Sequence, residues 1–457
     1  MAGTLAGILA EAAARTRFDE APAEVRERVE FLVADVLATA ISGGARRDVT
    51  AMRRIAGTGD GAATLIGEGR GVPAATAAYC NALGVAAEQL QDGHRLAKGH
   101  PASHLVPVLL ALGEESGAGG EAFMSAMLAG YEAGVRIGIA TGGTPPGVHD
   151  IGTWALVGAA VAGAHLLSGG KAAVIQSAIR IAGASPQAFD TETVFAGRSA
   201  SHLALASACQ SAVMASYAAV AGFDAEEDVI ERHWLVHSAA NYDSSAIRSS
   251  LDTNGSWKEY LVLGGYVKIH PACAHLHGAI DAAVSLGDQG RIDPREIDNV
   301  VVSTYAGAAA FDDREPGDDL RARFSLPYVV ASALANGRLD ENSLPEGAIG
   351  DEAAAELAKR VRVSATPEMD SGYPAGRPAK VEVHLFSGRT LLGEWSLPRG
   401  DGTRALLDPE VRSKPRRLLA GKVGEQSADR LLAEVSGLAR GGVLALLSAE
   451  LRRVRLG

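Results

Sequence analysis

Apolar residues recur at every third or fourth position along roughly the first 260 residues of the chain. This period matches the 3.6 residues of an α-helical turn, so the apolar side chains fall on one face of a helix. Residues 25–42 show the pattern and stop at Gly43 and Gly44, which end helices readily. The same spacing predicts helices over residues 74–90, 105–115, 121–141, 151–167, 171–182 and 199–221.

A different pattern begins after Tyr266. Runs that are rich in β-branched residues, or that alternate apolar with polar residues, predict strands over 297–304 (IDNVVVST), 361–365, 379–386 (AKVEVHLF) and 391–395. Helices are predicted between them at 274–286 and 327–335, and the tail from 408 to 456 is helical again.

These patterns predict a mostly α fold with two domains. Residues 1–267 and 396–457 form a large all-helical domain, and residues 268–395 form a smaller α+β domain. The helical part shows no regular alternation of strands and helices, which argues against a Rossmann-type parallel sheet.

Length and charge narrow the classes of function. At 457 residues the chain exceeds a single hydrophobic core, which fits two domains. The net charge of −11 argues against nucleic acid or an anionic membrane surface as a partner. An anionic small molecule stays open as a substrate, because a few local cations can dominate one pocket.

Cysteine usage and the N-terminus favour a cytoplasmic protein. Cys80, Cys209 and Cys273 are far apart and odd in number, so they offer no disulfide framework. The first 15 residues lack a basic stretch followed by an apolar one, and we therefore expect no signal peptide. Ser, Gln and Cys interrupt the apolar stretch 203–221, which predicts a buried helix rather than a membrane span.

Histidines gather at three places. The first lies where a loop enters the helix predicted at 105–115, and it holds Asp92, His94, Arg95, Lys98, His100 and His104. One interpretation is a polar loop that caps this helix. The other is an anion site, because a helix N-terminus carries partial positive charge and two cations lie nearby. The residues alone leave both open.

The second place is His149, in the turn TPPGVHDIGTWALVG before another helix. Asp150 or Thr153 could cap that helix, which is the structural interpretation. A neutral imidazole at a helix mouth is also a suitable general base, because its pKa lies near working pH.

The third place is the segment VKIHPACAHLHGAIDAA, which holds Lys268, His270, His275 and His277. His275 and His277 face different sides of a helix, and no HExxH or CxxC partner exists, so a zinc site is not favoured. A lysine beside a substrate carboxylate, with histidine for proton transfer, fits these residue types better. The glycine-rich segments 67–73 and 117–120 follow no predicted strand and do not indicate a dinucleotide loop. We expect neither a metal nor a cofactor.

Several longer segments, taken in order, resemble the MmgE/PrpD family, which includes 2-methylcitrate dehydratase, cis-aconitate decarboxylase and iminodisuccinate epimerase. They are YCNALGVAAEQLQDGHRLAKGHPASHLVPVLLAL, GYEAGVRIG, VHDIGTW, FAGRSASH, VKIHPACAHLHGAIDAA, RFSLPYVVASAL and YPAGRPAKVEVHLFSGR. The resemblance implies a helical domain with a smaller α+β lid, a homodimer, and an active site in the cleft between the domains. It also implies a small carboxylic acid as substrate and no cofactor.

The resemblance also implies roles for single residues. Catalytic roles fall on the positions that match family motifs, which are Asp92, His100, His149, Lys268, His277 and Tyr328. Substrate-binding roles are expected for His94, Arg95, Arg198, His202 and His270.

Three positions depart from the family pattern. Gly93 stands in a segment that usually reads DDTH, Asp150 replaces a proline, and Glu192 stands where many members have lysine. A buried carboxylate without a compensating charge costs several kcal/mol. We therefore expect Glu192 to change which substrate carboxylates bind, with Arg198 and His202 as relocated anion contacts.

The predicted chemistry is proton abstraction next to a carboxylate, with His149 or Lys268 as the base. Lys268 and His277 would stabilise the enolate-like charge, and Asp92, His100 and Tyr328 would orient or protonate the leaving group. A dehydratase-like lyase is the first interpretation. An epimerase or a decarboxylase shares the carbanion-like step, and a non-catalytic binding protein on the same fold is the alternative of another class.

Overall fold

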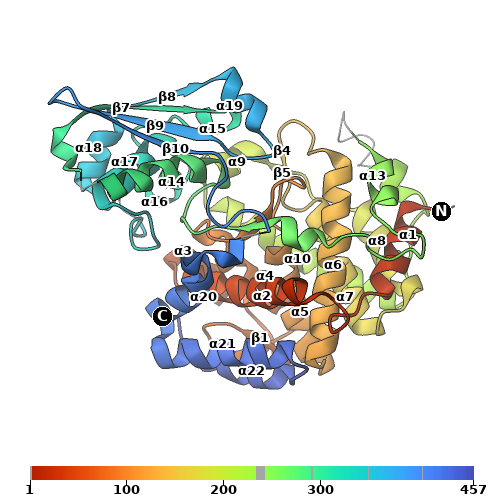
Figure 1. Cartoon of the computed structure of the whole chain (residues 1–457). Coiled ribbons are helices and arrows are strands. Elements are labelled where there is room, and N and C mark those ends of the chain that lie inside the picture. The colour runs from red at the N-terminus through yellow and green to blue at the C-terminus, as the bar shows by residue number, and fades with distance from the viewer. Residues whose placement is uncertain (1–2, 233–241, 290–291, 348, 404, 457) are drawn as a thin grey trace.

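The computed structural model describes residues 3–232, 242–289, 292–347, 349–403 and 405–456. A helical body makes up most of the molecule, and a smaller part that carries a sheet lies on one side of it (Figure 1). The mostly α fold predicted from the sequence is therefore confirmed.

The helical body is held together by one large apolar cluster, rich in alanine. Small residues let its helices approach closely: a Cβ on Gly134 of one helix would lie 2.9 Å from the Cα of Gly158 on the next. Its helices are α1 (Leu5–Ala14), α2 (Ala23–Gly44), α3 (Arg47–Ala56), α4 (Ala74–Ala87), α5 (Pro101–Ser116), α6 (Gly120–Thr141), α7 (Trp154–Ser168), α8 (Ala172–Ala184), α9 (Thr191–Phe195), α10 (Ala200–Val220), α11 (Val229–Arg232) and α13 (Ser244–Ser249).

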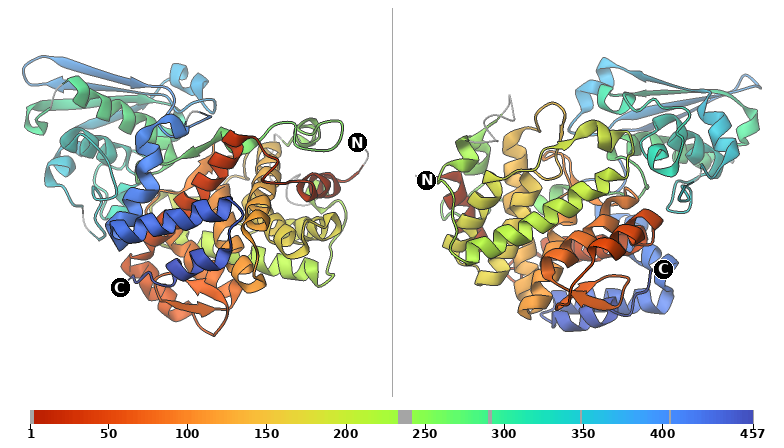
Figure 2. Two further views of the ribbon diagram at one scale, coloured as in Figure 1. Left: turned by 60° about the horizontal axis from the view of Figure 1, so that its bottom comes forward. Right: turned by 180° about the vertical axis from the view of Figure 1, so that it is seen from behind.

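The C-terminal tail packs against this body. Its helices are α20 (Pro409–Val423), α21 (Glu425–Ala439) and α22 (Leu444–Leu451). Helices α20 and α21 pack against α2, whereas α22 packs against α21 and α5, and Figure 2 shows these helices in blue against the helical body. A fully buried ion pair fastens the tail, because Lys414 Nζ lies 2.8 Å from Asp35 Oδ1.

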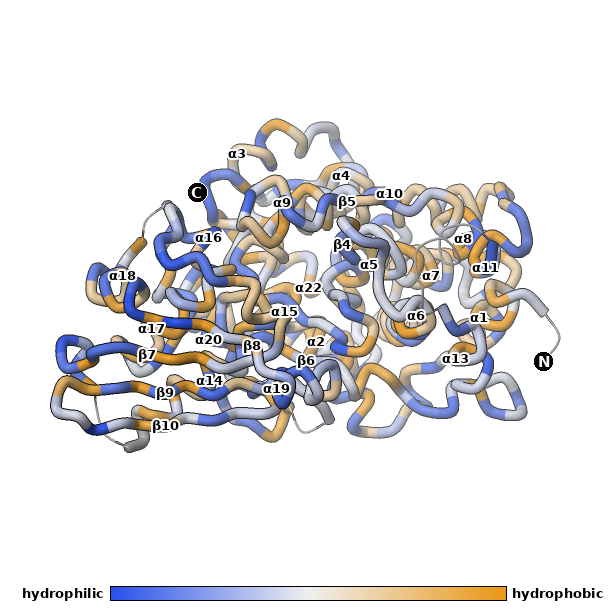
Figure 3. Tube along the Cα trace, turned by 90° about the horizontal axis from the view of Figure 1, so that it is seen from above, coloured by the Kyte–Doolittle hydropathy of each residue, from blue (hydrophilic) through white to orange (hydrophobic). Residues whose placement is uncertain are grey.

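The sheet-bearing part has a second apolar cluster of its own. Its four strands run in the order β10-β9-β7-β8, with β7 and β8 parallel and the other pairs antiparallel. Apolar and polar residues alternate along β9, as the hydropathy colouring of Figure 3 shows, and buried residues alternate with less buried ones along β7 from Val300 to Thr304, so that one sheet face is buried. Helices α14 and α17 pack against this sheet. The elements are α14 (His277–Ser285), β7 (Ile297–Thr304), α15 (Ala306–Ala309), α16 (Asp319–Ala322), α17 (Leu326–Asn336), α18 (Glu352–Ala358), β8 (Val361–Ala365), α19 (Pro367–Gly372), β9 (Ala379–Leu385) and β10 (Thr390–Trp395).

Three pairs of very short strands interrupt the helical body. The prediction of an all-helical domain therefore omitted these strands. They are β1 (Ala63–Leu65) with β2 (Arg70–Val72), β3 (Asp92–His94) with β6 (Gly265–Val267), and β4 (Val148–His149) with β5 (Phe189–Asp190). Strands of two or three residues leave no periodicity in a sequence. The glycine-rich segment 67–73 does follow a strand, contrary to the prediction, but it turns back into β2 as a hairpin.

Helix α10 is long and apolar enough to cross a membrane by length and composition, and it is the one such helix among the described residues. One such helix is weak evidence for a membrane span, because helices in the core of a protein can have the same length and composition. Here α10 packs against α4 and α7, and more than half of its most apolar stretch is buried within the protein. These contacts fit the buried helix predicted from the sequence.

Candidate active site

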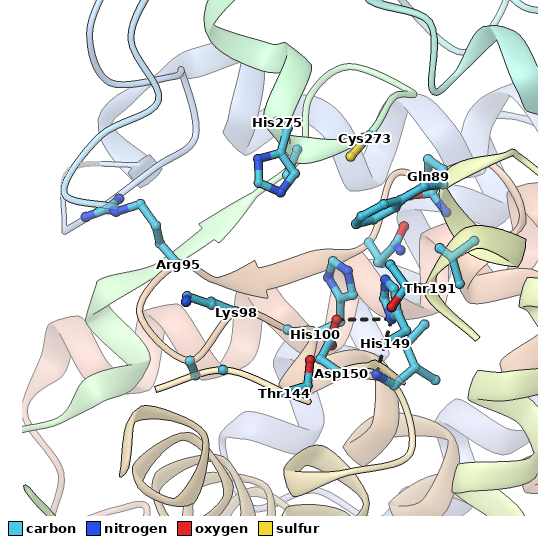
Figure 4. Close-up of a pocket in the computed structure, with 18 of the residues that line it drawn as sticks. Gln89, Arg95, Lys98, His100, Thr144, His149, Asp150, Thr191, Cys273 and His275 are labelled. Carbon is cyan, nitrogen blue, oxygen red and sulfur yellow. Dashed lines mark hydrogen bonds and ion pairs between the residues drawn. The ribbon is translucent and has the colours of Figure 1, made fainter. Parts of the chain in front are cut away.

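A cavity of about 290 Å³ lies where the helical body meets the sheet-bearing part (Figure 4). Its walls come from the loop after β3, the turn around β4, helix α9, the segment after β6, and a loop before β9. The volume lies at the small end of the range for ligand pockets, about 300–1,000 Å³. The cavity therefore fits a small organic molecule.

Two of the short strand pairs bring the walls of this cavity together. The pairing of β3 with β6 sets Asp92 opposite Val267, so the loop that follows β3 meets the residue after β6. The pairing of β4 with β5 sets His149 opposite Phe189 and draws in α9. As a result, four of the predicted residues line one cavity: Arg95, His100, His149 and Lys268.

The imidazole of His100 is held by the backbone, with Nδ1 2.5 Å from the carbonyl oxygen of Asp92. A carbonyl oxygen only accepts, so Nδ1 carries the proton and Nε2 keeps a lone pair. Burial and the charge of Lys268 lower the pKa of His100 well below its ordinary value. His100 is therefore a neutral acceptor, suited to orient a substrate hydroxyl rather than to protonate a leaving group.

The carboxylate of Asp92 occupies the N-terminus of α5. It accepts hydrogen bonds of 2.9 Å from the backbone N–H groups of Ala102 and Ser103, and one of 2.6 Å from the Ser103 hydroxyl. The anion site predicted at this helix end is thus filled by the protein itself. Burial raises the pKa of Asp92 to about 6. Asp92 does not line the cavity, and it acts on the site by holding α5 and His100.

His149 ends β4 and is nearly buried, with 8% of its surface exposed. Its Nδ1 lies 3.1 Å from Oδ1 of Asp150 and 3.3 Å from the backbone nitrogen of Ile151. The ring meets Phe195 edge-on, with centroids 5.7 Å apart. Because both contacts are at Nδ1, Nε2 is the ring nitrogen left for the cavity.

Asp150 lines the cavity beside His149. Among the described residues, its Oδ2 atom has no hydrogen-bond partner although it is buried. Burial raises the pKa of Asp150, while the charges of His149 and Lys268 lower it.

Lys268 is almost completely buried, with 1% of its surface exposed. Its Nζ donates a 3.0 Å hydrogen bond to Oε1 of Gln89. The described residues include no carboxylate in ion-pair contact with it. Burial lowers the pKa of Lys268 to about 7. A buried amine in this state is suited to bind an anion that enters the cavity.

Two arginines line another wall of the cavity, and both form ion pairs with the same carboxylate. Arg95 pairs with Oδ1 of Asp401, and Arg377 Nη1 lies 3.4 Å from Oδ2 of the same carboxylate. Arg377 also lies over the ring of Tyr266, 4.5 Å from its centroid. Since one carboxylate serves two cations, a positive charge remains for a ligand.

His275 and Arg377 also line the cavity, although no role was predicted for either of them. His275 Nδ1 lies 2.6 Å from the hydroxyl oxygen of Tyr305, whose ring stacks on Tyr373 with centroids 4.7 Å apart. Burial lowers the pKa of His275 to about 3, so this histidine stays neutral. Arg377 lies in the motif YPAGRPAK, which was the one signal that could have identified it.

The backbone adopts an uncommon conformation at two lining residues. Gln89 and Lys98 have φ angles of 55° and 57°, and they are the two non-glycine residues with positive φ in the described part of the chain. Such conformations are rare outside glycine and gather at functional sites. Lys98 is exposed at the mouth of the cavity, where its Nζ donates to the carbonyl of Gly142 at 3.0 Å.

Two predicted histidines of the third cluster lie outside the cavity lining. The rings of His270 and His277 are in edge contact, with centroids 5.2 Å apart. His270 is fixed by the carbonyl of Leu339 and by Asp281, each at 3.0 Å. His277 lies 3.3 Å from the carbonyl of Ala272. They lie on the same segment as Lys268 but outside the lining of the cavity.

The remaining predicted residues are also outside the lining. His94 is buried in β3, where its Nδ1 accepts from the backbone of Ala97 at 3.3 Å. Tyr328 lies in the apolar cluster of the sheet-bearing part, and Arg198 is exposed. His202 lies 3.7 Å from Asp48, outside the cavity.

Glu192 does not bring a buried charge into the site. Its side chain is exposed in the first turn of α9 and does not line the cavity, whereas Thr191 and Phe195 of the same helix do. The burial cost expected from the sequence therefore does not arise. Among the described residues, no group of three or more His, Cys, Asp or Glu side chains is arranged to hold a metal ion.

Fold and cavity define a class: a largely helical protein with an added mixed sheet and a small, cation-lined pocket between the two parts. Family comparison agrees with this class. The MmgE/PrpD N-terminal domain model matches residues 7–245, and the MmgE/PrpD C-terminal domain model matches residues 270–439. The chain belongs to the MmgE/PrpD family, as the sequence motifs predicted.

Curated relatives are distant but cover nearly the whole chain. A cis-aconitate decarboxylase-like protein of Aspergillus oryzae is 25% identical over 463 residues, covering 94% of each chain. A cis-aconitate decarboxylase of Aspergillus terreus is 23% identical over 447 residues, covering 90% of this chain and 88% of the relative.

Proposed function

We propose that this protein is a cofactor-independent lyase that removes a proton next to a carboxylate of a small di- or tricarboxylic acid. The observation that carries the proposal is the charge of the cavity. Four cations line it, namely Arg95, Lys98, Lys268 and Arg377, against one acid, Asp150. In a chain of net charge −11 such a concentration favours a ligand with more than one negative group.

The geometry supports separate roles for three residues. His149 offers Nε2 to the cavity and acts as the base that takes the proton from carbon. Lys268 binds the adjacent carboxylate and stabilises the charge that develops on it, because its ammonium has no carboxylate partner among the described residues. His100 accepts a hydrogen bond from a substrate hydroxyl, which orients the leaving group.

Decarboxylation is the second candidate, and the names of the Aspergillus relatives favour it. Loss of carbon dioxide leaves the same carbanion-like charge as loss of a proton, so the same cations would stabilise it. Epimerisation differs only in the return of the proton to the other face of the carbon.

A deuterium-exchange assay tests the proposal. The purified protein is incubated in D₂O with a panel of di- and tricarboxylic acids and their hydroxy, amino and imino derivatives, and proton NMR follows each compound. We expect deuterium to appear at a carbon next to a carboxylate. New alkene signals identify elimination, a second diastereomer identifies epimerisation, and loss of a carboxylate identifies decarboxylation. Thermal stabilisation by a compound that shows no exchange or turnover would favour a binding protein instead.

The pH dependence of kcat/KM separates the two possible bases. Below about pH 7 the free enzyme carries Lys268 as an ammonium, and above it as an amine. Since kcat/KM reports on the free enzyme, we expect kcat/KM to fall as the pH rises through about 7. A bound substrate carboxylate favours the ammonium form of Lys268, so kcat should begin to fall only at a higher pH than kcat/KM does. A rise of kcat/KM through pH 7 that persists in a His149→Gln variant would instead assign the base to the Lys268 amine.

A further inference from the structure

Asp150 is a largely buried acid whose carboxylate does not cap a helix. It precedes α7, where a carboxylate could cap the helix, yet no described side chain caps the first turn of α7. The Thr153 hydroxyl donates instead to the backbone carbonyl of Asp150, at 2.6 Å. The Thr153 N–H donates to the same carbonyl at 3.0 Å, so the backbone of Asp150 is fixed while its carboxylate is free for another role.

The carboxylate of Asp150 occupies a space that the fold keeps open for it. A Cβ on Gly99 would lie 2.4 Å from Oδ2, so any larger residue at position 99 would displace the acid. From this position Oδ1 contacts Nδ1 of His149 at 3.1 Å. Both side chains line the cavity, and the pair lies next to each other in Figure 4.

Two groups contact Nδ1 of His149, and they favour opposite protonation states of this nitrogen. The Ile151 N–H, 3.3 Å away, can only donate, and it favours an unprotonated Nδ1. A carboxylate on Asp150 can only accept, and it favours a protonated Nδ1. The charge of the Asp150 carboxylate, 3.1 Å from Nδ1, attracts a proton to this nitrogen more strongly than the neutral Ile151 N–H dipole, 3.3 Å away, opposes it.

We propose that Asp150 is a positioning residue that holds the proton of His149 on Nδ1, so that Nε2 presents its lone pair to the substrate. The catalytic part of this inference rests on the proposed function, whereas the tautomer does not. In the reaction, Nε2 takes the proton from the carbon next to the carboxylate, and the C–H electron pair becomes the enolate. His149 is then an imidazolium, and Asp150 stabilises it without itself receiving the proton.

Nitrogen NMR tests the tautomer without any assay of activity. The full chain is labelled with ¹⁵N-histidine, and the His149 signals are assigned by their loss in a His149→Gln variant. We expect the wild type to show a protonated Nδ1 and an unprotonated Nε2. In Asp150→Ala only the Ile151 N–H remains, and we expect the two signals to exchange character. A wild-type spectrum with the proton on Nε2 would mean that Nδ1 accepts from the Ile151 N–H or from a protonated Asp150, and either result overturns the proposal.

Steady-state kinetics then measure the consequence. Asp150→Ala should lower kcat by about 10²-fold, the size of a general-base contribution, with KM changed by less than about threefold. The matched control is Asp48→Ala, which removes the carboxylate from another Asp–His contact, 3.7 Å from His202 and outside the cavity. It should keep the wild-type kcat.

The outcomes separate the two proposals. If the tautomer is as expected but no carboxylic acid is turned over even by the wild type, the proposed function fails and the role of Asp150 in fixing His149 stands. If Asp150→Ala keeps both the wild-type tautomer and the wild-type kcat, the inference on Asp150 fails and the proposed function is untouched.

Discussion

A His149→Gln variant is expected to lose about three orders of magnitude in kcat/KM, because a positioned general base contributes about 10²–10⁴-fold. Glutamine is similar in size and keeps a polar group at the cavity wall, but its amide is far too weak a base to take a proton from carbon. The backbone at His149 is held by its pairing with Phe189, so the free energy of unfolding should change by no more than about 1 kcal/mol. The deuterium-exchange rate and the melting temperature, measured on the same preparation, check both statements.

The matched control for this variant is His384→Gln. His384 lies on β9, half-buried, with its ring 3.1 Å from the Thr390 hydroxyl, and it does not line the cavity. It should retain full activity. Full turnover by His149→Gln would remove His149 from the role of base and, with it, the catalytic importance of Asp150. The role of base would then pass to the amine of Lys268, the second candidate considered for it.

The fold was largely predictable because its main elements are long enough to show their period. The strands Ile297–Thr304 and Val361–Ala365 have the bounds that the β-branched runs predict, and α6 begins one residue from its predicted start. Helix α5 begins at Pro101, four residues earlier than its apolar pattern indicates. The first turn of α5 is capped by the carboxylate of Asp92, which lies in the preceding strand β3. Local periodicity cannot report such a contact.

The site was predictable only in part, because a sequence names residue types but not the direction in which they point. His94 and His100 are six residues apart, yet one is enclosed in β3 and the other lines the cavity. Arg377 comes from more than 100 residues after Lys268, and no local signal joins the two. Asp150 was visible as a departure from the family, but only the structure separates a helix cap from a contact with the base.

A Lys268→Met variant is expected to lower kcat/KM by about 10³-fold, since removal of one preorganised donor to a developing charge costs about 10²–10³-fold and substrate binding is lost as well. Methionine is similar to lysine in length, and it removes the charge together with the hydrogen bond to Gln89. The basic limb of kcat/KM near pH 7 should disappear from whatever activity remains. An unchanged pH profile would assign that limb to another group.

The stability of this variant should not fall, and the contrast with Lys414 explains why. Lys268 is buried with an amide as its partner, so methionine removes a desolvated charge and should leave the melting temperature at pH 7 unchanged or raise it. Between about pH 7 and 10.5 the unfolded wild type holds a proton on Lys268 that the folded protein has lost, so wild-type stability rises with pH there. Any gain in the free energy of unfolding of Lys268→Met over the wild type should therefore be largest below pH 7 and shrink towards pH 10.5.

Lys414→Met, in contrast, leaves Asp35 buried without its partner and should destabilise the fold by about 3–5 kcal/mol. Equal destabilisation by both variants would mean that Lys268 holds the fold together. The predicted difference between them would mean that the protein keeps Lys268 at the expense of stability, for the anion that it binds.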